Sequence, residues 1–77
     1  MKVYLIEDDM SIFELIKERF AQWTIEVIGP TDFQHIMDDF LTEQPQLVII
    51  DIQLPVFYFF HLCIDIRAIS KLPILFL

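Results

Sequence analysis

The clearest pattern in the sequence is a run of four apolar residues that ends on a single carboxylate. Residues 47–50 read Leu-Val-Ile-Ile with no polar residue among them, and Asp51 follows. An apolar run without alternation indicates a strand covered on both faces, as in the centre of a parallel sheet. The carboxyl ends of parallel strands open into the crevice where ligands bind, so Asp51 is placed for chemistry rather than for packing.

Three further segments have the patterns of strands. Residues 3–6 are apolar and end in the acidic residues 7–9, residues 24–28 are short and close on a Gly-Pro turn, and residues 73–77 are apolar. The segments between these strands have the spacing of helices. Strands that alternate with helices over short connections predict an α/β fold in the order β-α-β-α-β-α-β, with a parallel sheet and helices on its faces.

The first helix follows from an apolar stripe at helical spacing. Ser11, with Glu14 three residues later, resembles a capping box, and Asp9 is the alternative N-cap. Trp23 closes the stripe and is expected in the core or as a staple at the end of the helix. The stripe consists of Ile12, Phe13, Ile16, Phe20 and Trp23.

The second helix has the cleanest amphipathic pattern in the chain. Thr31 and Gln34 form a capping-box candidate at its start, and Pro45 ends it. The positions of its apolar residues fit one face of a helix. These residues are Phe33, Ile36, Met37, Phe40 and Leu41.

The third helix, predicted over residues 56–72, is apolar nearly all round. A helix of this kind is normally buried on all sides, so we expect a partner to cover it. The strand over residues 73–77 also lacks a further element to cover its edge. A two-fold dimer is the commonest closed solution, and we expect a second copy of the chain here. The predicted contact surface consists of Val56, Phe57, Tyr58, Phe59, Phe60 and Ile64.

Composition and charge narrow the function. The chain of 77 residues is one small domain (1–77), and its hydrophobic fraction of 56% exceeds what so short a chain can bury, so association is expected. The net charge of −7 argues against direct binding of nucleic acid, which requires basic residues. We find no leader and no apolar run long enough for a membrane helix. With Cys63 as the single cysteine, the expected setting is the reduced cytoplasm.

The acidic residues at the strand ends suggest a metal site. If the strands that precede residues 7–9 and Asp51 are neighbours, their carboxylates converge. Clustered carboxylates repel one another unless a cation neutralises them, and ligands that are all oxygen suit Mg²⁺. A carboxylate beside Mg²⁺ can also attack a phosphoryl group, which makes Asp51 a candidate nucleophile. The alternative is that Asp8 or Asp9 only caps a helix and Asp51 is merely solvated.

Four motifs occur along the chain in a specific order. They are Leu5-Ile6-Glu7-Asp8-Asp9, Val48-Ile49-Ile50-Asp51-Ile52-Gln53-Leu54-Pro55, Asp65-Ile66-Arg67 and Leu72-Pro73-Ile74-Leu75-Phe76-Leu77. In this combination the whole chain resembles the first two-thirds of the receiver domain of bacterial two-component response regulators. The resemblance is greatest to the receivers of winged-helix transcription regulators.

The resemblance implies a flavodoxin-like fold and a signalling module rather than an enzyme. Asp51 would be the phosphoacceptor, Glu7 and Asp8 the acidic pair, and Asp8, Asp51 and the backbone carbonyl of Gln53 the ligands of Mg²⁺. Such a domain takes its phosphoryl group from a sensor histidine kinase and then changes its dimerisation surface.

The chain departs from the receiver family in two places. It stops at Leu77, just before the family's Ser or Thr, and it lacks the later Lys, so the resemblance implies a module impaired as a switch. Tyr58-Phe59 also stands where the family commonly has Asp-Gly. Both departures favour a truncated and engineered fragment, incomplete on its own and completed by self-association, over a natural receiver whose remaining part is simply missing.

Two other functions stay open. The chain could be an engineered homodimeric assembly unit in which the acidic cluster is inherited without activity. It could also be a Mg²⁺-dependent phosphatase with Asp51 as nucleophile. Such enzymes usually carry a second Asp two residues later as the acid/base, and this chain has Gln53 there.

Overall fold

Helices and strands alternate along the chain as the sequence predicts. The computed structural model describes the backbone of residues 1–54 and 56–77, and the side chains of residues 1–54 and 60–77. The elements are β1 (Lys2–Ile6), α1 (Met10–Ala21), β2 (Glu26–Ile28), α2 (Ile36–Glu43), β3 (Leu47–Ile50), α3 (Val56–Ile69) and β4 (Ile74–Phe76).

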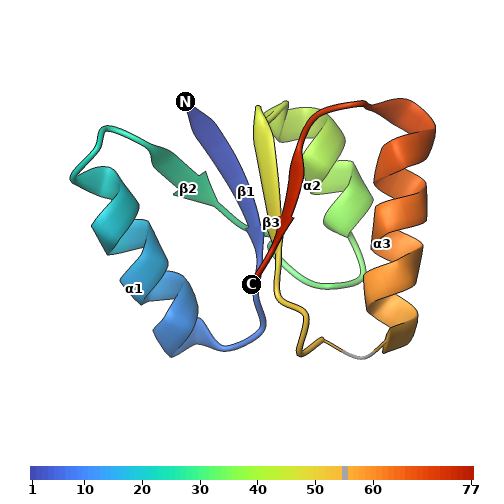
Figure 1. Ribbon diagram of the computed structural model, residues 1–77, viewed down its shortest axis with the longest axis horizontal. Coiled ribbons are helices and arrows are strands. Elements are labelled where there is room, and N and C mark those ends of the chain that lie inside the picture. Colours follow the sequence, from blue (N-terminus) through green and yellow to red (C-terminus); the bar gives the residue numbers. More distant parts are fainter. Residues whose placement is uncertain (55) are drawn as a thin grey trace.

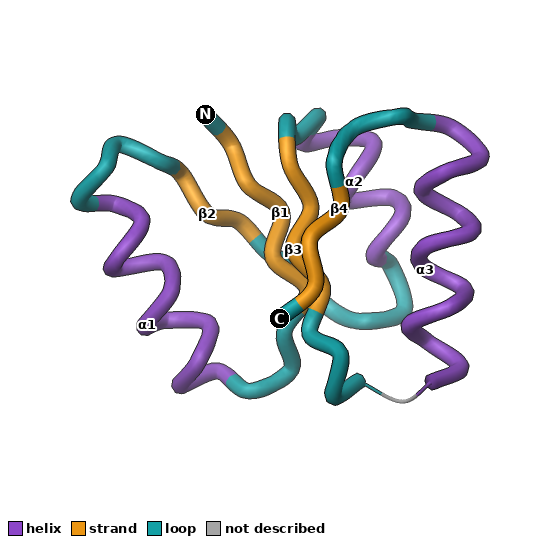
Figure 2. Tube along the Cα trace, viewed as in Figure 1, coloured by secondary structure: helices purple, strands orange, loops and turns teal. Residues whose placement is uncertain are grey.

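The strands form one parallel sheet in the order β2-β1-β3-β4. Helix α1 lies on one face of the sheet, and α2 and α3 lie on the other (Figure 1). The tube in Figure 2 shows β4 in front of β3, at the edge of the sheet. The predicted parallel α/β fold is confirmed, and β1 and β3 are its central strands.

The two faces of the sheet bury alternate residues of the same strands, because successive side chains of a strand point to opposite faces. On the face of α2 and α3, Tyr4 and Ile6 pack with Val48 and Ile50. On the face of α1, residues of the opposite parity pack around Phe13. The uninterrupted apolar runs of β1 and β3 are therefore explained by burial on both faces.

Helix α1 begins where the alternative N-cap predicted it. The side chain of Asp9 accepts hydrogen bonds from the backbone N–H groups of Ser11 (2.9 Å) and Ile12 (3.3 Å). The prediction that Ser11 caps the helix is wrong. Trp23, expected in the core or as a staple at the end of the helix, is not in the core, since it is 76% exposed. The helix ends at Ala21, and the turn that follows, with Thr24 at φ 59°, takes Trp23 off the apolar stripe.

Helix α2 begins at Ile36, later than the predicted capping box at Thr31 and Gln34. Asp32 accepts hydrogen bonds from the backbone N–H of Gln34 (2.7 Å) and from the ring of His35 (2.9 Å). This local turn competes with helix formation, so the capping-box prediction is wrong. The helix ends at Glu43, before the left-handed Gln44 (φ 51°) and Pro45.

Helix α3 also ends earlier than predicted, at Ile69 instead of residue 72. The guanidinium of Arg67 donates to the carbonyls of Ser70 (3.3 Å) and Leu72 (2.7 Å), which fixes the chain as it leaves the helix. Strands β2 and β4 are likewise shorter than their predicted segments. No helix in the described part of the chain is both long enough and apolar enough to cross a membrane.

A buried hydrogen bond ties the start of α2 to the central sheet. The hydroxyl of Tyr4 donates to the carbonyl of Ile36 across 2.9 Å, and its ring lies 6.0 Å from that of Phe40, centroid to centroid. Burial, with smaller contributions from Asp39 and Glu43, raises the pKa of Tyr4. The hydroxyl therefore keeps its proton and remains a donor.

Candidate functional site

The candidate site is built at the ends of the two central strands. In the ladder between β1 and β3, Ile6 lies opposite Ile50, so the residues that follow, Glu7 and Asp51, emerge side by side. The backbone N–H of Asp51 extends this ladder by one bond, donating to the carbonyl of Ile6 across 3.1 Å. The condition set by the sequence, that the two strands be neighbours, is met.

Three carboxylates converge at this edge of the sheet. Glu7, Asp8 and Asp51 each offer an oxygen, and these oxygens all lie within 4.8 Å of one another. Glu7 is 4% exposed and Asp51 7% exposed, while Asp8 is exposed to solvent. The side chains of Glu7 and Asp51 are thus buried, and that of Asp8 lies beside them, exposed to solvent.

The surroundings of Glu7 favour its protonated form. Burial removes water from the carboxylate, the neighbouring Asp51 adds hydrogen bonding and negative charge, and Asp8 adds hydrogen bonding, while the N–H of Asp9 opposes the effect. Together they raise the pKa of Glu7 from 4.5 to about 7. The cluster therefore holds a proton that a bound cation would compete with.

The loop after β3 holds the carboxylate of Asp51 in place. The backbone N–H of Gln53 donates to Oδ1 of Asp51 across 2.9 Å, and the N–H of Leu54 donates to the carbonyl of Asp51 across 3.2 Å. Leu54 is buried in the core on the side of α2 and α3. The loop is therefore anchored at Leu54, while Gln53 stays exposed beside the acids.

Residues 7–9 divide between two tasks. Asp9 caps α1, whereas Asp8 joins Glu7 and Asp51 in the cluster. The acidic cluster and the helix cap that the sequence offered as alternatives are thus both present, on different residues, whereas the expectation of a merely solvated Asp51 is wrong, since Asp51 is 7% exposed. The local pattern could not separate Asp8 from Asp9, because adjacent acids at a strand end look alike, and only the resemblance to receiver domains singled out Asp8.

The cluster lines an open pocket of about 310 Å³. Ile12 also lines this pocket, and sequence analysis assigned it only to the stripe of α1; its position one turn into the helix, after the capping Asp9, is the signal that places it there. No His or Cys is among the described residues that line the pocket. Carboxylate oxygens with space for water fit Mg²⁺ better than zinc or copper. The lining residues are Glu7, Asp8, Asp9, Ile12, Asp51 and Gln53.

The predicted contact surface on α3 is described only in part. The side chains of Val56, Phe57, Tyr58 and Phe59 lie outside the described residues. Phe60 and Ile64 are 59% and 65% exposed, whereas Leu62 and Ile66 are buried against the sheet. The helix therefore packs by one face and presents apolar side chains on another.

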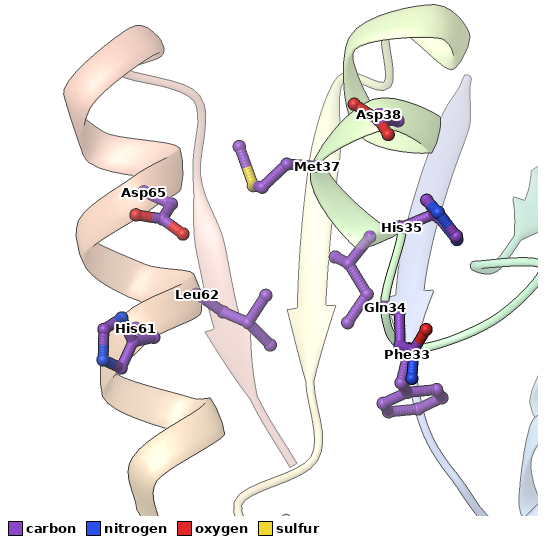
Figure 3. A pocket seen from close by; sticks show the side chains of 9 residues that line it. Phe33, Gln34, His35, Met37, Asp38, His61, Leu62 and Asp65 are labelled. Atoms are coloured by element: carbon purple, nitrogen blue, oxygen red, sulfur yellow. The ribbon is translucent and has the colours of Figure 1, made fainter.

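A second pocket, of about 220 Å³, lies between α2 and α3. Figure 3 shows Met37 and Leu62 projecting into it from opposite helices, with Asp65 beside them. Its walls combine apolar side chains with separate polar groups, and no cluster of three metal-ligating residues is found there among the described residues. The acidic pocket is therefore the stronger candidate for chemistry.

Relatives of the chain were found by sequence. Over 76 residues it is 50% identical to the sensory transduction protein BceR of Halalkalibacterium halodurans, covering 99% of this chain and 33% of the relative. Over 77 residues it is 43% identical to the response regulator protein GraR of Staphylococcus epidermidis, covering 100% of this chain and 34% of the relative. The chain thus spans about a third of the length of these relatives. No protein-family model matches it.

Two solved structures have a domain with the same fold as this chain. The N-terminal domain of the nisin resistance regulator NsrR, a lantibiotic response regulator, superposes with a TM-score of 0.90 at 32% identity, over 97% of this chain and 63% of that one. The BeF3-activated N-terminal receiver domain of RstA from Klebsiella pneumoniae superposes with a TM-score of 0.87 at 28% identity, over 99% of this chain and 65% of that one.

Proposed function

We propose that this chain, which has the sequence and fold of the N-terminal part of a response-regulator receiver domain, accepts a phosphoryl group on Asp51 in the presence of Mg²⁺. The observation that carries the proposal is the convergence of Glu7, Asp8 and Asp51 in one pocket at the ends of β1 and β3. Receiver domains are phosphoacceptor modules, so the proposed role is signalling rather than turnover of a substrate.

Four residues of the pocket have a part in the proposed transfer. Mg²⁺, when bound, would neutralise the negative charge of the carboxylates and of the incoming phosphoryl oxygens. Asp8, Asp51 and the backbone carbonyl of Gln53 would hold it, with Glu7 behind them. The N–H of Gln53 orients the carboxylate of Asp51. An oxygen of Asp51 then bonds to phosphorus as the bond to the donor breaks, and the donor leaves with that electron pair.

The phosphoryl donor and the output belong to the proposal as well. The relatives are named as sensory transduction and response regulator proteins, which supports a sensor histidine kinase as the donor to the whole protein. That protein would act in the cytoplasm and regulate transcription. The impairment of the switch inferred from the sequence stays a prediction.

The direct test is phosphorylation of the 77-residue chain by acetyl phosphate. With Mg²⁺ present, intact mass spectrometry should show the gain of one phosphoryl group, and EDTA should prevent it. Asp51→Asn should abolish the gain, while Asp9→Asn, which removes an equal charge from the same pocket, should retain it. A gain that survives Asp51→Asn would overturn the assignment of the acceptor.

A beryllofluoride mimic gives a second measurement that does not depend on turnover. The RstA receiver is described as BeF3-activated, which supports the use of the same reagent here. Beryllofluoride with Mg²⁺ should shift the amide signals of residues 51–54 in NMR spectra. No response to either reagent at millimolar Mg²⁺ would favour an assembly unit that only inherited the acidic cluster.

Self-association is a second proposal, and the exposure of Phe60 and Ile64 supports it. Large apolar side chains that stay in water on a chain this small favour burial against a partner, and a second copy is the partner we propose. Light scattering after size-exclusion chromatography should give twice the mass of the chain. A folded monomer at all concentrations would overturn this proposal and leave the phosphoacceptor proposal untouched.

A further inference from the structure

We propose that the groove between α2 and α3 binds a basic amphipathic helix of another protein. Apolar side chains of that helix would enter two pockets, and its Lys or Arg residues would lie against Asp38 and Asp65. The inference is independent of phosphorylation at Asp51. It is also independent of the self-association proposed above, because Phe60 and Ile64 line neither pocket.

Two pockets follow one another along the groove. The first, of about 220 Å³, lies at the start of α2 and the middle of α3, and Met37 and Leu62 project into it (Figure 3). The second, of about 260 Å³, is lined by the carboxyl ends of both helices, including Leu41 and Ile69. Both helices return from strands of one parallel sheet and therefore run in the same direction (Figure 1). Since Leu41 comes one turn after Met37, the two pockets lie in line.

The second pocket has apolar walls that stay in water. The buried sides of both helices pack against the sheet, as Phe40 and Ile66 do. Leu41 and Ile69 are 57% and 52% exposed, although both line the pocket. Large apolar side chains gathered in an open groove favour a partner that removes them from water.

The size and the walls of the pockets favour a helix as the occupant. Each pocket is smaller than the about 300–1,000 Å³ of usual small-ligand sites, so each suits one or two apolar side chains. The backbone groups of the walls are bonded within α2 and α3, so an extended strand would gain no backbone hydrogen bonds there. The residues that line the two pockets lie about two helical turns apart, which matches apolar residues at i and i+7 of a helix.

The charges around the first pocket favour a basic partner. Exposed Asp38 and Asp65 line this pocket from opposite helices. His35, which also lines it, is paired with Asp32 across 2.9 Å. Residues 20–66 contain seven acidic residues and no Lys or Arg, and basic residues return only at the far end of α3. A partner with Lys or Arg beside its apolar face is therefore attracted, and an acidic partner is repelled.

A synthetic peptide serves as the probe. It has about 15 residues, with Leu on one face of the helix and Lys on the other. In NMR titrations of the 77-residue chain it should shift the amide signals of Met37, Leu41 and Asp65 and leave those of α1 unchanged. Replacing its Leu with Ser, or its Lys with Glu, should each weaken binding at least about tenfold. No binding at millimolar peptide, or shifts centred on α1, would overturn the proposal.

Charge-matched variants separate the groove from the net charge of the chain. Asp38→Asn combined with Asp65→Asn should raise the dissociation constant of the peptide at least about tenfold. Glu14→Gln combined with Glu18→Gln removes the same charge from exposed positions on α1. This control should change the constant less than about twofold at moderate salt, because distant surface charges are screened. Equal losses in the two double variants would show attraction by net charge alone and would contradict the proposal.

Leu41 provides the test of the apolar contact. Leu41→Ser should weaken peptide binding at least about tenfold, because it removes an apolar wall of the second pocket. Leu15 on α1 is matched in residue type and is 53% exposed, so Leu15→Ser is the control and should bind like the parent chain. Circular dichroism would confirm that both variants fold. An unchanged affinity in Leu41→Ser, or an equal loss in both variants, would contradict the proposal.

A second copy of the chain is the competing occupant of the groove. In that case the amide signals of Met37, Leu41 and Asp65 would shift when the chain is concentrated without peptide. Such shifts would overturn the assignment to another protein. Signals that stay constant on concentration and move only with the peptide would support it. Neither result depends on phosphorylation, so a failure here and a failure with acetyl phosphate are distinguishable.

Discussion

The backbone N–H of Asp51 donates to the carbonyl of Ile6 across 3.1 Å. This bond continues the ladder between β3 and β1 past the last paired residues of the strands. It fixes Asp51 next to Glu7, so the backbone brings the two acids together. The repulsion between the carboxylates is therefore built into the fold, and it acts on the protonation of Glu7 and on the binding of Mg²⁺.

The first prediction concerns the pH dependence of stability. The pKa of Glu7 is about 7 in the folded chain against 4.5 as reference, so its contribution to stability is fully present below about 4.5 and is lost as pH rises through 7. The loss should reach about 3 kcal/mol. Urea unfolding in EDTA at pH 5 and pH 8 would measure it. Glu7→Gln should remove this part of the pH dependence. An equal change in the free energy of unfolding between pH 5 and pH 8 in both proteins would contradict the prediction.

The second prediction separates the two adjacent acids. Asp8→Asn should weaken Mg²⁺ binding at least about tenfold, because it removes a charged ligand from the cluster. Asp9→Asn should leave both Mg²⁺ binding and stability nearly unchanged, since Asn is an equally good N-cap. Asp9→Ala should cost about 1 kcal/mol of stability. Calorimetric titration with Mg²⁺ and urea unfolding would check these results, and equal losses of Mg²⁺ affinity in the two Asn variants would count against the division of roles.

The third prediction tests the link between the sheet and α2. Tyr4→Phe keeps the ring contact with Phe40 but removes the donor to the carbonyl of Ile36. We expect a loss of about 1 kcal/mol in the free energy of unfolding and faster hydrogen exchange in the first turn of α2. Mg²⁺ binding serves as the control and should not change. An unchanged free energy of unfolding would show that the hydrogen bond contributes nothing net.

The fourth prediction concerns the turn after β2. A Cβ at Gly29 would lie 2.5 Å from Cε2 of Phe13 and 3.1 Å from the carbonyl oxygen of Leu5. Gly29→Ala should therefore cost about 1–3 kcal/mol, because the buried ring must shift. In a double-mutant cycle with Phe13→Leu, which removes the ring, the combined loss should be smaller than the sum of the two single losses. Additive losses would show that the ring is not the obstacle.

The sequence determined the succession of elements and the placement of Asp51. Short apolar runs such as residues 47–50 indicate strands buried on both faces, and the stripes between them indicate helices, so the parallel α/β fold followed from local patterns. The same patterns located acids at two strand ends. They also showed that α3 has more apolar surface than the sheet can cover, as the exposed Phe60 and Ile64 bear out.

The tertiary structure decided which residues meet. That Asp8 joins Glu7 and Asp51 while Asp9 caps α1 depends on the strand order and on the path of the loop after β1, which involve residues more than forty positions apart. The late start of α2 was decided by a turn in which the side chain of Asp32 competes for backbone hydrogen bonds. The exposure of Trp23 was decided by the turn after α1, where Thr24 is left-handed. The periodicity of apolar residues in the sequence shows which face of a helix or strand is buried. Which residues from distant parts of the chain contact one another is decided only when the sheet forms.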